Sequence, residues 1–287
     1  MFLYEKLSNE NFDVFNKLTE KANNQVKYRL DFYKEYDKKS FINKYFLRKF
    51  VRLIKYNNVY IGYIWLENQS VKSVRINDMY ILEDFLDKID NYTMNQMKSD
   101  IVIYEMYENQ YSLKLINKLK FNRYKLTFLM KMNLNDKIQY MVPNGIFYRF
   151  YSKKTDRKLR CAIQNSVFRN EGRVPLNTND IMFDEEQDYY INDLCIFIMK
   201  NNIPIGYGQI IYSRGIYSIV NIGILEGYRG FGYGKALVYK LIDLAYEKNI
   251  KEIYIRVESI NKNARYLYES IGFKEIGVIS NWIWNKK

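Results

Sequence analysis

Three glycines alternate in a short stretch whose composition is typical of a phosphate-binding turn, Arg229-Gly230-Phe231-Gly232-Tyr233-Gly234-Lys235. A run typical of a buried strand, 216–225, precedes it, and an amphipathic helix follows. Glycine lets the backbone turn tightly, so that its N–H groups can approach a ligand. The start of a helix adds unpaired N–H donors and the positive end of the helix dipole. Together these features predict a cradle for a phosphate or pyrophosphate.

The spacing of these glycines narrows the class of cradle. It is G-x-G-x-G, which differs from the G-x-G-x-x-G of a dinucleotide fold and lacks the long gap and Lys-Ser/Thr ending of a P-loop. A glycine-rich tight turn that binds nothing is the structural alternative. The seven residues leave both interpretations open, and the rest of the chain must decide between them.

Composition limits the chemistry that the chain can perform. The 287 residues include no histidine, which excludes a Ser-His-Asp or Cys-His nucleophile system and argues against a zinc site. We therefore expect no metal. Proton transfer must use Tyr, Glu, Asp, Lys or water. No Cys or Ser lies in a motif that would form an acyl-enzyme.

The cysteines and the apolar runs indicate a reduced compartment. Cys161 and Cys195 both lie in apolar patterns and are expected to be buried free thiols. The start of the chain lacks the basic and apolar segments of a secretory leader. The longest apolar runs, such as 194–199, fall far short of the roughly 20 residues that span a bilayer. We expect a cytoplasmic protein without a membrane partner.

A formal net charge of +13 raises the possibility of a nucleic-acid partner. Residues 1–140 carry 24 basic and 17 acidic side chains, and residues 141–287 carry 21 and 15. The excess is therefore spread over the chain and forms no basic run. The composition is also rich in Asn, Lys, Ile and Tyr throughout. We interpret the charge as solvated surface and expect no nucleic-acid partner.

The order of expected elements repeats once, with a period near 144 residues, which indicates a duplicated domain. Lys55-Tyr56-Asn57-Asn58 with Ile61-Gly62-Tyr63 matches Lys200-Asn201-Asn202 with Ile205-Gly206-Tyr207. Each asparagine pair is expected to turn a hairpin. Strands are expected at 2–7, 51–55, 59–66, 73–82, 101–106 and 124–132, then at 146–151, 195–200, 205–213, 216–225 and 252–257. Helices are expected at 11–21, onward to about 50, at 111–119 and at 156–168, with loop and helix at 169–190.

The two halves differ where chemistry would take place. Pro143-Asn144-Gly145 breaks regular structure, so we expect domains at 1–140 and 141–287. Of 13 glycines only Gly62 precedes residue 145, so the first half has no glycine cradle. Its segment 84–100 is also too short for a loop plus a long helix. A ligand bound through phosphate is therefore expected in the second half.

A second motif follows the cradle helix and the strand 252–257. It reads Asn261-Lys262-Asn263-Ala264-Arg265-Tyr266-Leu267-Tyr268-Glu269-Ser270-Ile271-Gly272-Phe273. The R-G-x-G-x-G turn, its helix, and N-x-x-A-x-x-x-Y-x-x-x-G-F some 30 residues later resemble the GNAT superfamily of N-acetyltransferases. The resemblance covers about 195–287. Residues 1–140 match only in layout, as in the degenerate half of tandem GNAT proteins.

The resemblance implies an α/β fold of two tandem acyl-CoA N-acyltransferase domains with a mixed sheet, and acetyl-CoA as co-substrate. The cradle amides would hold the pyrophosphate, and the end of strand 216–225 would bind the pantetheine arm. Tyr268 would protonate the leaving thiolate, although a packed helix tyrosine is the alternative. The residues implied to bind the cofactor are Ile222, Ile224, Leu225, Arg229, Gly230, Phe231, Gly232, Tyr233, Gly234, Lys235, Asn261 and Ala264.

Some of the family pattern is missing. Glu226-Gly227 stands where many relatives have Pro-Glu or Pro-Asp, and no acid lies in 216–225, where many relatives place a general base. Glu258 is the first candidate for that base. Glu185 and Glu186 are the second, unless they are ordinary carboxylates or a water chain serves instead. In the first half, Ile116 aligns with Tyr268 and Lys120 with Gly272, so we expect a non-catalytic domain.

The expected function is direct transfer of an acetyl group from acetyl-CoA to a primary amine of a small molecule or peptide, through a ternary complex. The acids at 184–188 are expected to attract a cationic acceptor. Trp282 and Trp284 are candidates for an acceptor pocket or for the core. Two alternatives remain: a CoA-binding module without turnover, and a tRNA-dependent aminoacyl transferase of tandem-GNAT-like type.

Overall fold

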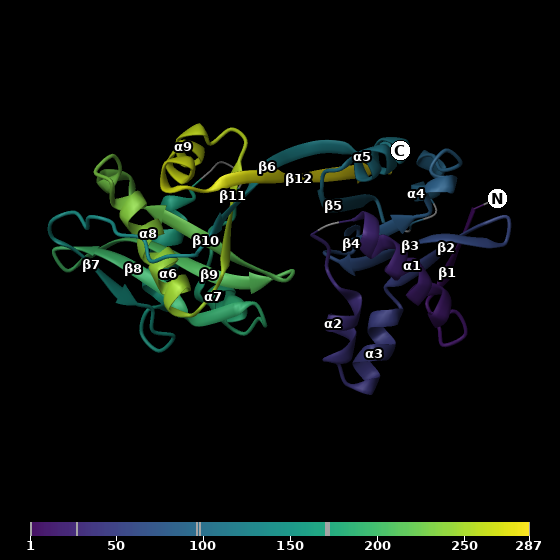
Figure 1. The fold of residues 1–287 in the computed structure, drawn as a ribbon. Helices are drawn as coiled ribbons and strands as arrows, with labels where there is room; N and C mark the ends of the chain where they lie inside the picture. The colour runs from purple at the N-terminus through teal and green to yellow at the C-terminus, as the bar shows by residue number, and fades with distance from the viewer. Residues whose placement is uncertain (1, 27, 96, 98, 170–172, 287) are drawn as a thin grey trace. The chain divides into compact units, whose positions relative to one another are not determined.

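The computed structural model describes residues 2–26, 28–95, 97, 99–169 and 173–286. The chain forms two compact units, drawn in Figure 1. The first contains Met1–Thr127 and Gly277–Lys287, and the second contains Phe128–Ile276. These bounds differ from the domains expected at 1–140 and 141–287, because the chain passes between the units within two strands, β6 and β12.

The first unit is a mixed sheet with short helices. Its strands follow the order β1-β2-β3-β4-β5-β12 and are antiparallel except for the parallel pair β4–β5. The strands are β1 (Phe2–Lys6), β2 (Val51–Tyr56), β3 (Val59–Asn68), β4 (Ser73–Ile81), β5 (Ile101–Tyr107) and the end of β12 (Lys274–Asn285). The helices are α1 (Phe12–Gln25), α2 (Phe32–Asp37), α3 (Phe41–Arg48), α4 (Asn91–Asn95), α5 (Gln110–Lys118) and the short η1 (Glu83–Phe85).

The second unit repeats this plan with longer elements. From one edge its strands are β7-β8-β9-β10-β11 followed by the end of β6, and the parallel pair is β10–β11. The strands are β6 (Asn122–Asn133), β7 (Ile146–Phe150), β8 (Tyr190–Lys200), β9 (Ile203–Ser213), β10 (Ile216–Ile224) and β11 (Glu252–Glu258). The helices are α6 (Arg157–Val167), α7 (Thr178–Glu185), α8 (Tyr233–Glu247), α9 (Lys262–Ile271) and η2 (Glu226–Tyr228). Part of the segment expected at 169–190 lies outside the described residues.

The hairpin turns explain why the repeat is visible in the sequence. Asn57 and Asn58 have φ values of 47° and 66°, and Asn201 and Asn202 have 48° and 66°. A two-residue hairpin with both central residues at positive φ matches the twist of the strands that it joins, and asparagine tolerates this conformation better than most side chains. The two pairs therefore set the same register in each unit.

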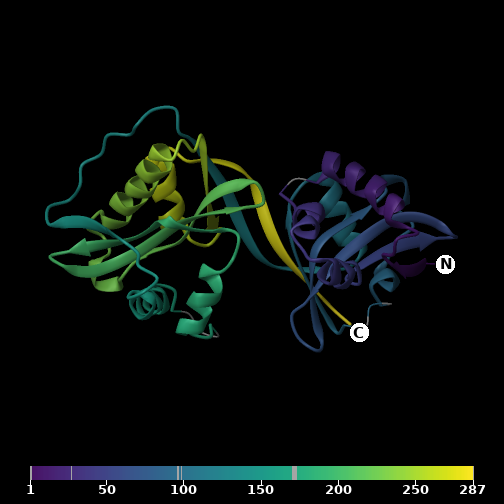
Figure 2. The same cartoon turned by 90° about the horizontal axis from the view of Figure 1, so that it is seen from below.

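In the second unit, helices cover opposite faces of the sheet, as the lime α8 and the teal-green α6 and α7 show in Figure 2. A Cβ placed on Gly208 would lie 2.8 Å from Leu241 of α8, whereas one on Gly223 would lie 2.0 Å from Val167 of α6. Successive strand residues face opposite sides. Tyr207, between Gly206 and Gly208 on β9, therefore faces α6. The cofactor helix expected from the sequence is α8, and it buries eight residues.

The last strand belongs to the core of the first unit. Residues Ile279–Asn285 of β12 pair with β5, and Trp284 is only 1% exposed. Its indole N–H donates to the Asn91 side chain at 2.7 Å, and that of Trp282 donates to Ser280 at 2.7 Å. Both rings belong to the first unit's core, which is one of the two roles expected for Trp282 and Trp284. Cys161 and Cys195 are free and buried, as expected.

Truncating Trp284 should destabilise the first unit selectively. Trp284→Ala removes a fully buried ring and is expected to cost about 3–5 kcal/mol, whereas Val71→Ala, at a fully exposed site, should change stability by less than about 0.5 kcal/mol. Hydrogen exchange read residue by residue should show faster exchange in β5 of the Trp284 variant and unchanged exchange in β9. Faster exchange in β9 with β5 still protected would contradict this assignment.

Candidate functional site

The glycine turn leads into α8 as an uncapped helix start. Gly230 and Gly232 have φ values of 86° and 78°, which favour glycine strongly. Gly232 is the N-cap residue and no side chain caps the helix. A Cβ added to either glycine would meet nothing within 4 Å. The first N–H groups of α8 therefore face open space, which is the arrangement that an anion requires.

The neighbouring strands diverge beside this turn. β10 and β11 pair only from Tyr217–Ile253 to Ile219–Ile255 among the described residues. Beyond that point β10 has an irregularity between Val220 and Gly223, where Asn221 takes a φ of 53°. The bulge bends β10 away from its parallel neighbour. The last residues of β10 thus lie next to a gap in the ladder, where backbone groups are accessible to an extended ligand.

The turn, the end of β10 and α9 meet at one place. A Cβ on Gly234 would lie 3.8 Å from Ile224 and 3.7 Å from Leu267 of α9. The Arg229 side chain donates to the Ile224 carbonyl at 3.0 Å. Arg229 thus fixes the turn to the strand, and its own backbone N–H donates to the Glu226 carbonyl at 3.1 Å. Of the other residues expected here, Ile222 lies on the α8 face, 3.4 Å from a Cβ on Gly208.

The aromatic residues and the lysine of the turn differ in exposure. Phe231 is 65% exposed, whereas Tyr233 is buried, and the two rings stack at 5.8 Å. The Lys200 ammonium lies 5.7 Å from the Tyr233 ring. Lys235 is half-buried and lies 5.9 Å from the ring of Tyr239. Leu225 packs against the cluster beneath α6, and its N–H donates to Ile205 at 2.8 Å. Its amide is therefore already used within the fold.

Helix α9 supplies the candidate acid. Tyr268 is 7% exposed, and burial raises the pKa of its phenol to about 12. It is therefore a proton donor, not a base, over the whole neutral range. Asn261 caps α9 by accepting the Ala264 N–H at 3.1 Å. The side-chain oxygen of Asn261 and the N–H of Ala264 are thus bonded to each other.

The candidate base lies at the same end of the sheet as α9. Glu258 ends β11 and is exposed, and its carbonyl accepts the Asn261 N–H at 2.9 Å. The carboxylate of Glu258 is therefore accessible to water. The structure therefore positions Glu258 near the start of α9, on the strand that borders the gap beside β10.

The acidic cluster at 184–188 is largely committed to internal contacts. Glu185 accepts from Arg157 at 2.8 Å and from the Tyr151 hydroxyl, and it is 6% exposed. Asp184 accepts from the buried Arg160 and from Tyr189 at 2.7 Å. Removing one partner of such a pair leaves a buried charge uncompensated. These two carboxylates hold α7 against α6, and the idea that they attract a cationic acceptor loses its main residues.

A buried polar cluster beneath α6 and α7 was missed by the sequence analysis. Arg160 is 1% exposed and its guanidinium carbon lies 5.1 Å from the Tyr207 ring. Two of its nitrogens, Nε and Nη1, have no partner among the described residues, and neither do the side-chain nitrogens of Gln164 and Gln209. Buried donors of this kind require ordered water or a ligand. In the sequence, one arginine and two glutamines within amphipathic patterns do not indicate that their side chains meet in one place.

The equivalent place in the first unit is closed. Ile81 occupies the position of Ile224 in the repeat, and the Tyr111 hydroxyl donates to its carbonyl at 2.6 Å and accepts its N–H at 2.8 Å. Tyr111 is buried at the start of α5. Both backbone groups of Ile81 are therefore occupied by a side chain. Lys120, which aligns with Gly272, adopts a φ of 60°, compared with 115° for Gly272. A turn with positive φ therefore forms there without the glycine.

Comparison with known proteins agrees with these features. Residues 165–273 match the model of the Acetyltransferase (GNAT) family. This part of the chain is therefore similar to the GNAT family. The matched stretch contains β10, the glycine turn, α8, β11 and α9, so the family resemblance rests on the part of the second unit that forms the candidate site.

Curated relatives match part of this chain. The [ribosomal protein bS18]-alanine N-acetyltransferase of Haemophilus influenzae is 36% identical over 89 residues, which are 31% of this chain and 60% of the relative. An N-alpha-acetyltransferase of Sulfurisphaera tokodaii is 37% identical over 65 residues, 22% of this chain and 39% of the relative. The matches thus span less than two thirds of either relative.

Solved structures extend the likeness to both units of the chain, as a likeness of fold. A GCN5-related N-acetyltransferase from Sphaerobacter thermophilus has a TM-score of 0.72 at 13% identity, covering 99% of this chain and 95% of that one. A tandem GNAT protein from the clavulanic acid biosynthesis pathway has a TM-score of 0.67 at 10% identity, covering 99% and 98%. The fold is therefore that of tandem GNAT proteins.

Adding a methyl group at Gly223 should disturb the bulge of β10. The new Cβ would lie 2.0 Å from Val167, so Gly223→Ala is expected to cost about 1–3 kcal/mol through overpacking. Gly227→Ala is the matched control, because its Cβ would meet nothing within 4 Å. Chemical denaturation would measure both. The double variant Gly223→Ala/Val167→Ala should recover most of the loss, and equal destabilisation by both glycine variants would contradict this packing.

Proposed function

We propose that this protein is a GNAT N-acetyltransferase, which transfers the acetyl group of acetyl-CoA to a primary amine with the co-substrate bound in the second unit. The observation that carries the proposal is that the start of α8, which no side chain caps, lies beside the end of β10, which no longer pairs with β11. Backbone amides of 230–235 would hold the pyrophosphate, with the helix dipole favouring its charge. The pantetheine arm would lie along the end of β10 at Ile224.

The transfer itself is a direct attack. The amine nitrogen bonds to the thioester carbonyl carbon, the carbon–sulfur bond breaks, and the thiolate takes a proton from Tyr268. The amine loses its proton to Glu258 or to water. An N–H of β10 near Ile224 would polarise the carbonyl oxygen, as an oxyanion-hole donor does. No residue of this chain needs to carry the acetyl group.

The acceptor belongs to the proposal at the level of its chemical class, a primary amine of a peptide or small molecule. The Haemophilus influenzae relative is named for an alanine of a ribosomal protein. A peptide N-terminus is therefore the first acceptor to test, and a panel of small-molecule amines is the second. Free thiols at Cys161 and Cys195 fit a reducing compartment, and we place the enzyme in the cytoplasm.

The first unit is proposed to be non-catalytic. Tyr111 occupies the backbone of Ile81, and α4 has five residues where α8 has 15. Neither a pantetheine arm nor a pyrophosphate would find the groups that the second unit offers. The first unit would therefore support the assembly without binding acetyl-CoA.

Filling the glycine turn should abolish co-substrate binding. Gly232→Trp places an indole over the start of α8, so titration calorimetry should show binding of acetyl-CoA to the wild type and none to the variant. Gly215→Trp is the matched control, because Gly215 has a similar φ of 80° and equally open surroundings but lies at the opposite end of β10. Retained binding by Gly232→Trp would contradict the cradle.

Removing the Tyr268 hydroxyl should slow transfer without changing its pH dependence. Tyr268→Phe is expected to lower kcat by about 100-fold or more, with acetyl-CoA affinity nearly unchanged. Because burial raises the pKa of Tyr268 to about 12, the phenol is protonated throughout pH 6–9 and adds no inflection there. Steady-state rates on an accepted amine would measure both profiles. An inflection present in the wild type and absent from the variant would contradict this role.

The alternative is a CoA-binding protein without turnover, which the absence of an acid from Ile216–Ile224 favours. It predicts retained acetyl-CoA binding with no transfer to any peptide or amine of the panel. A product mass increased by one acetyl group would exclude it.

A further inference from the structure

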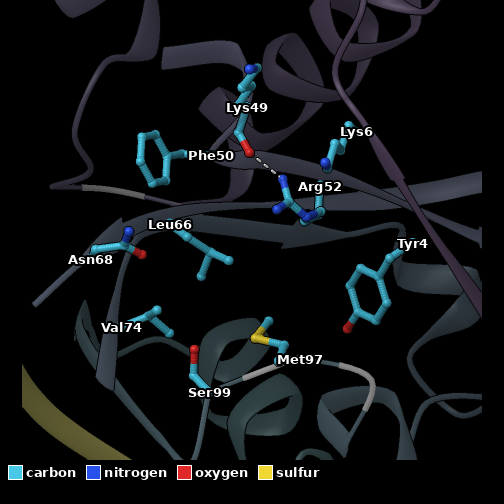
Figure 3. Close-up of a pocket in the computed structure, with 10 residues that line it drawn as sticks. All are labelled: Tyr4, Lys6, Lys49, Phe50, Arg52, Leu66, Asn68, Val74, Met97 and Ser99. Atoms are coloured by element: carbon cyan, nitrogen blue, oxygen red, sulfur yellow. Dashed lines mark hydrogen bonds between the residues drawn. The ribbon is translucent and has the colours of Figure 1, made fainter. Parts of the chain in front are cut away.

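The first unit contains a hollow on one face of its sheet. Its volume is about 360 Å³, which lies within the range of small-ligand pockets. Figure 3 shows the side chains that line it, from β1, β2, β3, β4 and the segment after α4. The lining residues are Tyr4, Lys6, Lys49, Phe50, Arg52, Leu66, Asn68, Val74, Met97 and Ser99.

The hollow lies on the sheet face that α8 covers in the second unit. Tyr148 of β7 donates to the Ala236 carbonyl of α8 at 3.0 Å, and Tyr4 of β1 donates to the Thr93 carbonyl of α4 at 2.6 Å. Because these two bonds join corresponding strands to the helices that follow, the start of α4 corresponds to the start of α8. From there α8 continues to Glu247, whereas α4 ends at Asn95. The hollow therefore occupies the place of the missing helix turns.

The strand residues at this place differ in chemical type between the two units. Phe150 pairs with Ile196 in the second unit, at the position where Lys6 pairs with Arg52 in the first. Ile196 pairs in turn with Gly208, which lies directly under Leu241 of α8. The buried Ile196 and the exposed Phe150 thus correspond to two cations at the hollow. If the only change were the loss of the helix, uncharged polar side chains would be sufficient at the newly exposed surface.

Among the residues that the structure describes, the two cations have no acidic partner. None of the ten lining residues is acidic, and no carboxylate of the described residues pairs with Lys6 or Arg52. The half-buried Arg52 donates to the Lys49 and Val51 carbonyls, and burial lowers its pKa. An arginine remains charged at neutral pH even so. The Lys49 ammonium lies 4.3 Å from the Tyr45 ring, so Lys49 lines the hollow mainly with its backbone.

The opposite side of the hollow is apolar. Figure 3 shows Lys6 and Arg52 together on one side, with Leu66, Val74 and Met97 across the pocket from them. Val74 and Met97 are buried. A ligand that satisfies both sides needs an anionic group and a hydrocarbon body, because a free anion leaves the apolar side in water.

We propose that the first unit binds a small organic anion with an apolar body, a carboxylate or phosphate monoester, in the hollow between Arg52 and Met97. The site lies on the half of β4 that pairs with β5, whereas Ile81 marks the other end of that strand. It is thus separate from the position that corresponds to the acetyl-CoA site of the second unit. The proposal does not depend on the proposed acetyl transfer.

The test is an NMR titration of the intact chain, followed through the backbone amides of residues 6 and 52. The probes are hexanoate, hexyl phosphate, the neutral hexanamide, acetate and inorganic phosphate. Hexanoate or hexyl phosphate should shift these amides with an affinity about tenfold or more above that of hexanamide, since a charge-assisted hydrogen bond contributes about 1.5–3 kcal/mol. The stronger of the two anions identifies the headgroup. Acetate and inorganic phosphate should bind more weakly, because they lack the apolar body.

Charge-removing variants locate the site independently. Lys6→Gln, at an exposed position, and Arg52→Gln should each weaken the preferred anion, with the larger loss for Arg52. Lys17→Gln on α1 is the control and should leave the affinity unchanged, because Phe15 of α1 packs on Tyr63, which faces the opposite side of the sheet. Equal affinities for hexanoate and hexanamide, or shifts confined to the start of α8, would overturn the proposal. So would the lack of any shift at residues 6 and 52.

Discussion

The candidate site depends on the point where two parallel strands stop pairing. The ladder of β10 and β11 ends at Ile219 and Ile255, and the bulge at Asn221 turns the remaining strand residues away. Val167 of α6 packs so closely on Gly223 that no side chain fits at residue 223. The divergence exposes the backbone around Ile224 next to the start of α8. Without it, the glycine turn would hold a phosphate with nowhere for the rest of the ligand to lie.

The first unit has the same plan as the second but differs at the place that corresponds to the candidate site. β4 and β5 also pair only at one end, from Ser73–Ile101 to Ile76–Tyr104. The gap that follows is closed by the Tyr111 hydroxyl, which satisfies both backbone groups of Ile81. Buried backbone polar groups require partners, so a tyrosine in that position replaces what a ligand would otherwise supply. Shortening of the helix to α4 then leaves space elsewhere on the same unit.

Much of this arrangement could be read from the sequence, because it depends on local rules. The asparagine pairs at 57–58 and 201–202, the glycine turn and the N-cap Asn261 each specify their geometry within a few residues. The buried Arg160 cluster could not be predicted, since it brings α6, α7, β8 and β9 together through contacts distant in the chain. The assignment of β12 to the first unit also escaped, because its alternating pattern fits either sheet. The acids at 184–188 looked like a surface cluster because their arginine partners lie 24 to 28 residues away.

The central claim is that one chain offers one acetyl-CoA site, at β10 and α8, while Tyr111 closes its counterpart. A direct test is native mass spectrometry of the intact chain with saturating acetyl-CoA, on the wild type and on the Tyr111→Phe variant. Amide hydrogen exchange then locates the protected backbone. The account predicts one bound acetyl-CoA per chain and protection at 222–235, with none gained at residue 81 in the wild type. Two molecules per chain, or protection at residue 81 and not at 222–235, would contradict it.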